Sequence, residues 1–174
     1  PLMPIGACMV AEACERAAHR VAMLVLMFET QPHEAVGNAI LSSRPDVVGL
    51  SVRNIDNNDM RDTAFFLEDL RRMVNTVREH CDAPVILGGA ALAVMPEAIL
   101  RFCEVSCGVL GDGETVFPLL LDRIAEGEPF GDIPGIAYLH HDGYNCKPCS
   151  GQGGSTDCGA PGYHRWVDVP SYRS

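Results

Sequence analysis

The stretch Pro84-Val85-Ile86-Leu87-Gly88-Gly89-Ala90-Ala91 decides the fold class of this chain. Large apolar residues follow the proline, and residues with almost no side-chain volume come next. A short apolar run between turn residues is typical of a strand that is buried on both faces of a parallel sheet. We therefore expect a strand over residues 84–88 and a tight loop directly after it.

Helical and strand patterns alternate on both sides of this strand. Residues 62–80 carry apolar side chains at helical spacing, which predicts an amphipathic helix. Similar patterns predict helices over 4–19, 32–43, 95–102 and about 113–126, and strands over 21–28, 47–51 and 107–110. This alternation favours an α/β fold with a doubly wound, Rossmann-like parallel sheet, which binds ligands at the carboxyl ends of its strands.

Gly and Pro content divides the 174 residues into two parts, with 15 such residues among the first 126 and 14 among the last 48. This change predicts a compact domain over 1–126, followed by a hairpin and connector over 127–174. Residues 136–139 precede the turn residues His141-Asp142-Gly143, so we expect them to form the first arm of a hairpin outside the main sheet.

Charge and hydropathy argue against two classes of partner. Lys and Arg total 13 against 23 for Asp and Glu, and this net charge of −10 disfavours nucleic acid. The longest apolar run, over residues 21–28, is far shorter than the ~20 residues that span a bilayer, so we expect no membrane span.

The cysteines favour a reducing, cytoplasmic location. Most of the 8 cysteines lie in or beside apolar segments of a chain that is long enough to bury a core without disulfides. Cys146, Cys149 and Cys158 lie in the Gly-rich tail, at a spacing that matches no common zinc site well. A linker with free thiols is therefore favoured over metal binding or a redox pair.

Loops at the expected carboxyl edge hold the candidate site residues. Ser51-Val52-Arg53-Asn54-Ile55-Asp56 mixes groups that suit hydrogen bonding to amides or carboxylates, and Gly88-Gly89-Ala90 lets a bulky ligand approach the backbone. Gly111-Asp112-Gly113-Glu114 places carboxylates where a phosphate would bind, and Val116 replaces the third glycine of a dinucleotide motif, so a pyrophosphate site is disfavoured. Ordinary turns and helix caps remain the alternative for each loop.

Taken together, three motifs resemble the cobalamin-binding domain of cobalamin-dependent radical S-adenosylmethionine enzymes: Ser51-Val52-Arg53-Asn54-Ile55-Asp56-Asn57, Leu87-Gly88-Gly89 and Gly111-Asp112-Gly113-Glu114. The opening Leu2-Met3-Pro4-Ile5-Gly6 is also similar to that family, so the resemblance covers roughly residues 1–126. His164-Arg165-Trp166-Val167-Asp168, followed by Tyr172, looks like the family's connector to a catalytic barrel, although the chain holds no CxxxCxxC cluster motif.

The resemblance implies that cobalamin rests on the carboxyl edge, with its nucleotide tail between strands and helices. It also implies radical methyl transfer or a related rearrangement, with S-adenosylmethionine and a 4Fe-4S cluster bound in a domain that these residues do not include. Carried over by position, the residues that would contact the corrin amides or the tail are Ser51, Val52, Arg53, Asn54 and Asp56. Those that would leave room for the tail are Gly88, Gly89 and Ala90, and those that would close the far side are Gly111, Gly113 and Glu114.

The sequence departs from related patterns at two places. The DxHxxG motif of other cobalamin domains is absent, because Gln31 and Val36 flank His33, so we expect His33 to be a surface residue at a helix start. A flavodoxin-like strand order of 2-1-3-4-5 places its first strand between the second and third, and no segment of the sequence supplies that strand. We expect residues 21–28 either to pair directly with 47–51 or to form a poorly held edge.

Two other functions stay open. A flavin- or nucleotide-binding module of the same fold would favour a basic, Gly-rich loop after Phe28, where the chain has Glu29-Thr30-Gln31-Pro32. A ligand-free interaction domain, similar to a receiver fold, would use Asp56 or Asp112 together with an acidic cluster at the end of a first strand.

Overall fold

The computed structural model describes residues 3–54, 66–148 and 162–172. Its α-helices are α1 (Ile5–Arg16), α2 (Pro32–Ser43), α3 (Leu67–His80), α4 (Pro96–Phe102) and α5 (Gly113–Glu126). Its strands are β1 (Val48–Ser51), β2 (Val85–Gly88), β3 (Cys107–Val109), β4 (Ile136–His140) and β5 (Gly143–Cys146), and its short 3-10 helices are η1 (Leu26–Phe28), η2 (Tyr163–Arg165) and η3 (Val169–Tyr172).

A mixed five-stranded sheet in the order β1-β2-β3-β4-β5 forms the centre of the molecule. The first three strands run parallel, as predicted, and follow one another as the last three strands of a flavodoxin-like order do. The α/β, Rossmann-like fold class is confirmed, and the helices after β2 and β3 begin within one residue of their predicted starts. The helix predicted over 62–80 is observed as Leu67–His80, and residues 62–65 lie outside the described residues.

The hairpin of β4 and β5 belongs to the main sheet, so the expectation that it lies outside is wrong. β4 pairs antiparallel with β3, and Val109 faces Ile136 in the register. Ile136 and Ala137 are fully buried. A free β3 edge would leave backbone groups unpaired, and adding an apolar strand there satisfies them and buries its side chains.

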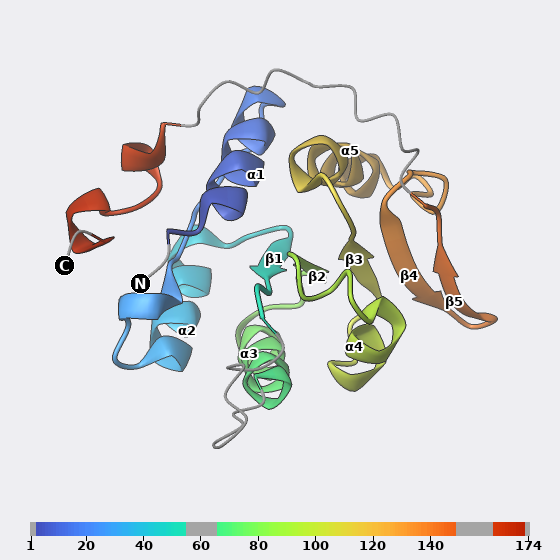
Figure 1. Cartoon of the computed structure of the whole chain (residues 1–174), viewed down its shortest axis with the longest axis horizontal. Helices are drawn as coiled ribbons and strands as arrows, with labels where there is room; N and C mark the ends of the chain where they lie inside the picture. Colours follow the sequence, from blue (N-terminus) through green and yellow to red (C-terminus); the bar gives the residue numbers. More distant parts are fainter. Residues whose placement is uncertain (1–2, 55–65, 149–161, 173–174) are drawn as a thin grey trace.

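Helices cover both faces of the sheet (Figure 1). Successive residues of β2 point to opposite faces, so Val85 and Leu87 join one apolar cluster while Ile86 joins the other. α2, α3 and α4 contribute to the first cluster, and α5 contributes Val116 and Leu120 to the second. β2 is thus buried on both faces, as its sequence predicts.

α1 packs on α5 and runs in the same general direction. A Cβ placed on Gly113 would lie 3.0 Å from Cγ2 of Val10, and further along Nε2 of His19 lies 3.1 Å from Oδ1 of Asp122. Because α5 begins just after β3, the first turn of α1 also lies at the carboxyl edge of the sheet.

The predicted strand over residues 21–28 does not form. Residues 21–25 have no regular secondary structure, and η1 follows them. Neither expected outcome applies, since the segment does not pair with β1 and is not a strand of the sheet. Only Leu26 packs against the first apolar cluster, and an apolar run without a neighbouring strand has no partner for its backbone groups.

Candidate functional site

The loops after β1 and β2 are joined by their backbones at the carboxyl edge. The N–H of Val52 donates to the carbonyl oxygen of Gly88 at 2.7 Å, and the N–H of Ala91 donates to that of Val52 at 3.1 Å. Val52 is buried. The structure therefore brings the first two predicted loops together into one continuous surface.

Gly88 and Gly89 have different surroundings. Gly89 has a φ of +95°, and a Cβ there would lie 2.4 Å from the carbonyl oxygen of Val52, so any side chain would collide with backbone. A Cβ on Gly88 would meet only the carbonyl oxygen of Val109, at 3.9 Å, among the described residues. Gly89 makes the loop junction possible, whereas a Cβ on Gly88 would make one ordinary contact and would collide with none of the described residues.

Polar side chains of the first loop lie at the surface beside this junction. Ser51, Arg53 and Asn54 are exposed, and they make no side-chain hydrogen bond or ion pair with the other described residues. Their donors and acceptors are therefore available to a ligand. Asp56, the remaining predicted contact in this loop, lies outside the described residues.

The loop after β3 completes the edge. Gly111 has a φ of +79°, and Gly113 begins α5 against Val10 of α1. Glu114 lies half-buried in the first turn of α5, while the Asp112 side chain makes no capping hydrogen bond to the helix. This loop is anionic and turned toward α1, which agrees with the prediction against a pyrophosphate site.

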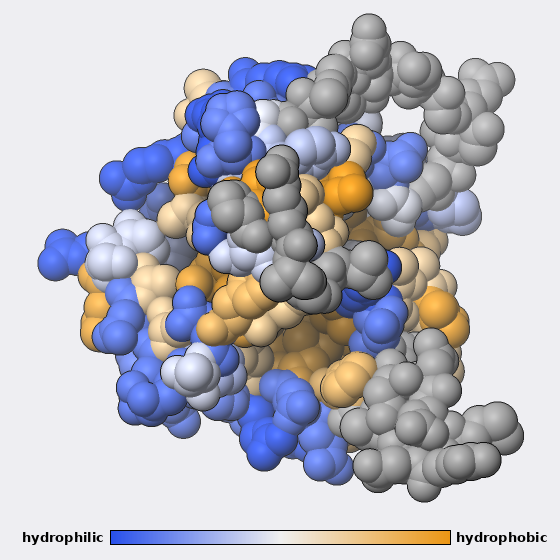
Figure 2. All heavy atoms as spheres, turned by 60° about the vertical axis from the view of Figure 1, so that its left-hand side comes forward, coloured by the Kyte–Doolittle hydropathy of each residue, from blue (hydrophilic) through white to orange (hydrophobic). Residues whose placement is uncertain are grey.

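Apolar side chains that the sequence analysis did not single out also lie at or near this edge. Val94 and Met95, in the loop after β2, are 67% and 45% exposed, and Ile5 in the first turn of α1 is 50% exposed. Figure 2 shows apolar surface gathered in a hollow on the side of the molecule that carries both chain ends. The signal available in the sequence was Val94-Met95, which follows the small residues 88–91 after only Leu92 and Ala93.

The buried thiols of Cys14 and Cys107 are poor acid–base groups. Burial raises the pKa of Cys107 to about 12 and, with a smaller contribution from Asp122, that of Cys14 to about 11. Across the described ranges, no group of His, Cys, Asp and Glu could hold a metal ion. Cys146 is exposed and free, and Cys149 and Cys158 lie outside the described residues.

His33 is an exposed residue in the first turn of α2, as predicted. Its Nδ1 lies 2.7 Å from Oγ1 of Thr76, a buried residue of α3. This contact fastens α2 to α3, which gives the histidine a structural role. Within the described part of the chain, no helix is long and apolar enough to cross a membrane.

The edge fits a large ligand that is mostly uncharged. Unused hydroxyl, amide and guanidinium groups lie on one side, Gly88 presents only backbone, and exposed apolar side chains lie nearby. Cobalamin has this chemistry, with amide-bearing side chains around an extended ring. A dinucleotide would meet the carboxylates of the third loop instead.

Comparisons with known proteins point to the same ligand class. A family model described as B12 binding domain matches residues 1–121. A tryptophan 2-C-methyltransferase from Streptomyces laurentii is 27% identical over 139 residues, which are 78% of this chain and 23% of that protein. A hopanoid C-3 methylase from Methylococcus capsulatus is 26% identical over 144 residues, which are 82% of this chain and 26% of that protein.

Solved structures resemble the domain as well. The radical S-adenosylmethionine methyltransferase TsrM from Kitasatospora setae, with cobalamin and a 4Fe-4S cluster bound, is 27% identical with a TM-score of 0.80, covering 86% of this chain and 27% of that one. The cobalamin-dependent radical enzyme OxsB, with aqua-cobalamin bound, is 15% identical with a TM-score of 0.67 over 84% of this chain and 20% of that one, which shows the fold alone.

The chain thus spans about a quarter of the length of the curated relatives it matches. The family match covers β1 to β3, the loops at their carboxyl ends and most of α5. The chain belongs to the B12 binding domain family.

Proposed function

We propose that this domain holds cobalamin on the carboxyl edge of its sheet, as the cobalamin-binding part of a radical S-adenosylmethionine methyltransferase. The observation that carries the proposal is the joined edge, where residues 88–90 present almost no side-chain volume beside unused hydrogen-bonding groups. Family membership supports the ligand, and the names of the relatives support the reaction class.

In this proposal the first loop provides the polar contacts. Ser51, Arg53 and Asn54 bind the amides of the corrin or the tail, and Val52 fixes the loop through its backbone. Asp56 is retained as a contact from the sequence alone. Gly88 and Ala90 leave room for the tail beside the Gly89 junction.

The far side is closed by Gly111, Gly113 and Glu114, where α5 begins against α1. Exposed apolar residues such as Val94 and Met95 give a large ring a surface to lie on. Bound cobalamin supplies the methyl-carrying cobalt, while the protein positions and shields it.

The reaction as a whole needs more than these residues. S-adenosylmethionine and the 4Fe-4S cluster would be bound by another domain of such an enzyme. The candidate cobalamin loops all lie before about residue 126, the hairpin that follows extends the same sheet, and the connector comes after it. The cysteines in the described ranges are free thiols, which supports a reducing compartment such as the cytoplasm.

Reconstitution tests the proposal. The full chain is incubated with hydroxocobalamin, desalted and examined by visible absorbance, with flavin mononucleotide in a parallel sample. We expect the corrin spectrum to be retained and the flavin to be lost. A desalted protein without corrin absorbance would contradict cobalamin binding, and retained flavin in its place would favour a flavin module.

A matched pair of variants tests the site. Gly88→Val adds a branched side chain at the carboxyl edge, where a Cβ would meet only the Val109 carbonyl oxygen among the described residues. It should lower cobalamin affinity by about tenfold or more, with little change in thermal stability. Ala83→Val adds similar volume at the opposite end of β2 and should keep wild-type affinity. Equal affinity of both variants would exclude the space above Gly88 as the tail site.

A further inference from the structure

A docked segment near the end of the chain contacts the first helix of the domain. Residues 162–172, named the strap here, consist of η2, η3 and the turn between them. Val167 in the strap is buried, at 8% exposure. The strap contacts α1 across more than 140 residues of sequence, so tertiary contacts alone hold it in place.

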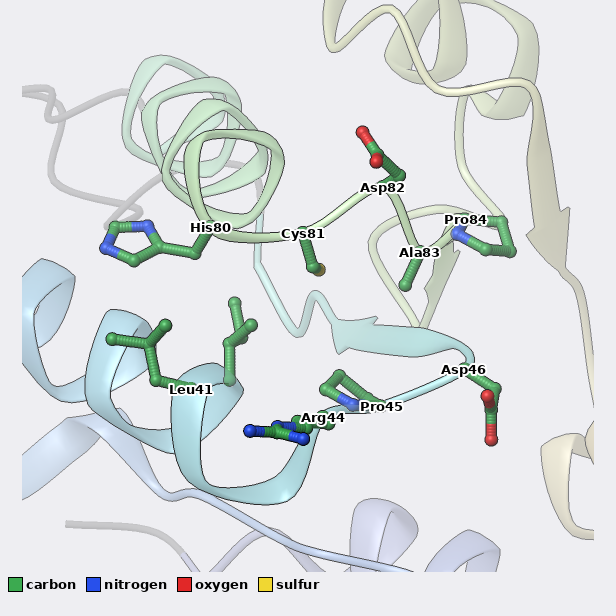
Figure 3. A pocket seen from close by; sticks show the side chains of 10 residues that line it. Leu41, Arg44, Pro45, Asp46, His80, Cys81, Asp82, Ala83 and Pro84 are labelled. Atoms are coloured by element: carbon green, nitrogen blue, oxygen red, sulfur yellow. The ribbon is translucent and has the colours of Figure 1, made fainter.

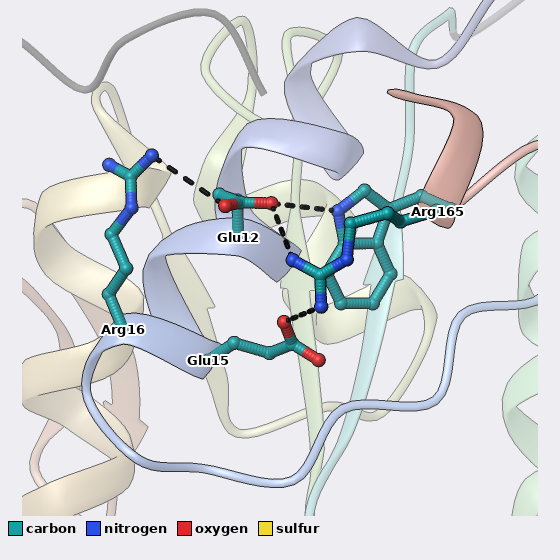
Figure 4. A network of polar contacts seen from close by, with 5 residues as sticks. Glu12, Glu15, Arg16 and Arg165 are labelled. Atoms are coloured by element: carbon teal, nitrogen blue, oxygen red, sulfur yellow. Dashed lines mark hydrogen bonds and ion pairs between the residues drawn. The ribbon is translucent and has the colours of Figure 1, made fainter. Parts of the chain in front are cut away.

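Glu12 of α1 is the centre of the first attachment (Figure 4). Its Oε2 accepts a hydrogen bond from Nε1 of Trp166 at 3.2 Å and lies 3.4 Å from Nη1 of Arg165. Glu15 adds a contact of 2.5 Å between its Oε2 and Nη2 of Arg165. The Glu12 side chain is only 18% exposed, so its contacts with the strap are partly shielded from water.

Tyr172 makes the second attachment. Its ring meets that of Phe28 edge-on, with centroids 4.9 Å apart. Burial, and to a smaller extent the nearby Cys8 thiol, raises the pKa of Tyr172. Its hydroxyl is buried without a hydrogen-bond partner among the described residues.

These two attachments give the strap a direction. Arg165 and Trp166 lie against Glu12 and Glu15, while Tyr172 lies near Cys8, one turn closer to the start of α1. The strap therefore runs antiparallel to α1, toward the carboxyl edge. The strap contacts α1 and η1, which lie beside the carboxyl edge but are not strands of the sheet.

We propose that the strap positions the first turn of α1 and the loop after Phe28 for cobalamin, with Glu12, Arg165 and Trp166 as positioning residues. The inference rests on the proposed function, because the strap contacts the supports of the site. A detached strap leaves α1 held by α5 but frees η1 from Tyr172. Docking and cobalamin binding then favour each other, and by linkage each strengthens the other by the same factor.

Trp166 is the only tryptophan of the chain, so its fluorescence reports on the strap directly. In the cobalamin-free full chain, Glu12→Ala should increase quenching of this fluorescence by iodide. Glu12→Gln keeps an acceptor for the indole N–H, so its iodide quenching should lie between that of Glu12→Ala and that of wild type. Arg16→Ala removes only the contact within α1, 3.7 Å from the other Glu12 oxygen, and should match wild type.

Cobalamin dissociation is then measured for the same proteins. We expect Glu12→Ala to release cobalamin about fivefold faster, a typical size for coupled sites, and Arg16→Ala to release it at the wild-type rate. The same linkage predicts that cobalamin slows hydrogen exchange at the amides of Trp166, Val167 and Ser171, which are bonded within the strap.

The outcomes separate the inference from the proposed function. A wild-type chain that binds no cobalamin contradicts the proposed function. A wild-type chain that binds, with a Glu12→Ala variant that undocks the strap yet releases cobalamin at the same rate, overturns the inference. If Glu12→Ala fails to fold, Trp166→Phe takes its place, with strap docking measured by hydrogen exchange. Undocking without faster cobalamin release in that variant would likewise overturn the inference.

Discussion

The two ends of the sheet offer a ligand different surroundings. At the amino ends, where chain leads into β1 and β2, a cavity of about 560 Å³ is lined by the ends of α2 and α3 (Figure 3). A second cavity of about 560 Å³ lies near Ser106, where the chain enters β3. At the carboxyl ends, small residues and exposed polar groups form an open edge instead.

A cavity of this size is therefore not by itself the best candidate site. The amino-end cavity mixes Arg44, Asp46, His80 and Asp82 without a common ligand chemistry. The carboxyl edge combines a loop junction, residues with almost no side-chain volume and unused donors, which suits a large ligand lying across it. Chemistry and topology, rather than volume, separate the two ends.

The largest expected effect is at the loop junction. Gly89→Val would force a side chain into the backbone of Val52 at a positive φ, and should lower the free energy of unfolding by about 3 kcal/mol. Urea unfolding measures this loss, with Ala83→Val at the amino end as the control. Equal stability of the two variants would contradict the described junction.

A smaller effect is expected at an exposed side chain of the edge. Arg53→Ala should weaken cobalamin binding by about tenfold, the loss of a charge-assisted hydrogen bond, without changing stability. Arg44→Ala makes the same substitution beside the amino-end cavity and should leave affinity unchanged. A cobalamin titration followed by corrin absorbance compares the affinities of the two variants. A larger loss of affinity in Arg44→Ala than in Arg53→Ala would place the site at the amino end.

The smallest effect should be a gain in stability at the amino end. Arg44 ends α2 with a φ of +47°, a conformation that costs a non-glycine residue free energy. Arg44→Gly should therefore raise the free energy of unfolding by about 0.5–1 kcal/mol while cobalamin affinity stays at the wild-type value. Thermal unfolding measures the gain, and a lower midpoint would show that the Arg44 side chain stabilises the cavity wall.

Local pattern was sufficient for most of the elements. The helix predicted over 32–43 is observed as Pro32–Ser43, and the strand predicted over 84–88 as Val85–Gly88. Proline at a helix start and a short apolar run between turn residues are local signals that need no distant partner. The positions of the candidate loops followed from the same pattern, because parallel strands end at a common edge.

The same apolar signal failed over residues 21–28. That run is as apolar as β2, but β2 has a neighbouring strand on each side and the run has none. The hairpin was predicted outside the sheet for a related reason, because local sequence does not show that the free edge of β3 pairs with β4. Strand pairing is a long-range interaction, and a single apolar run does not specify it.

From the sequence alone we could predict the alternation of helices and strands, the residues at the carboxyl edge and the family they resemble, because these depend on local periodicity and on motifs. The tertiary structure was needed to show that the Val52 backbone requires a glycine at position 89, while a Cβ on Gly88 would collide with none of the described residues. It alone placed Trp166 against Glu12. Both relations join atoms far apart in the chain, and packing, rather than local conformational preference, creates them.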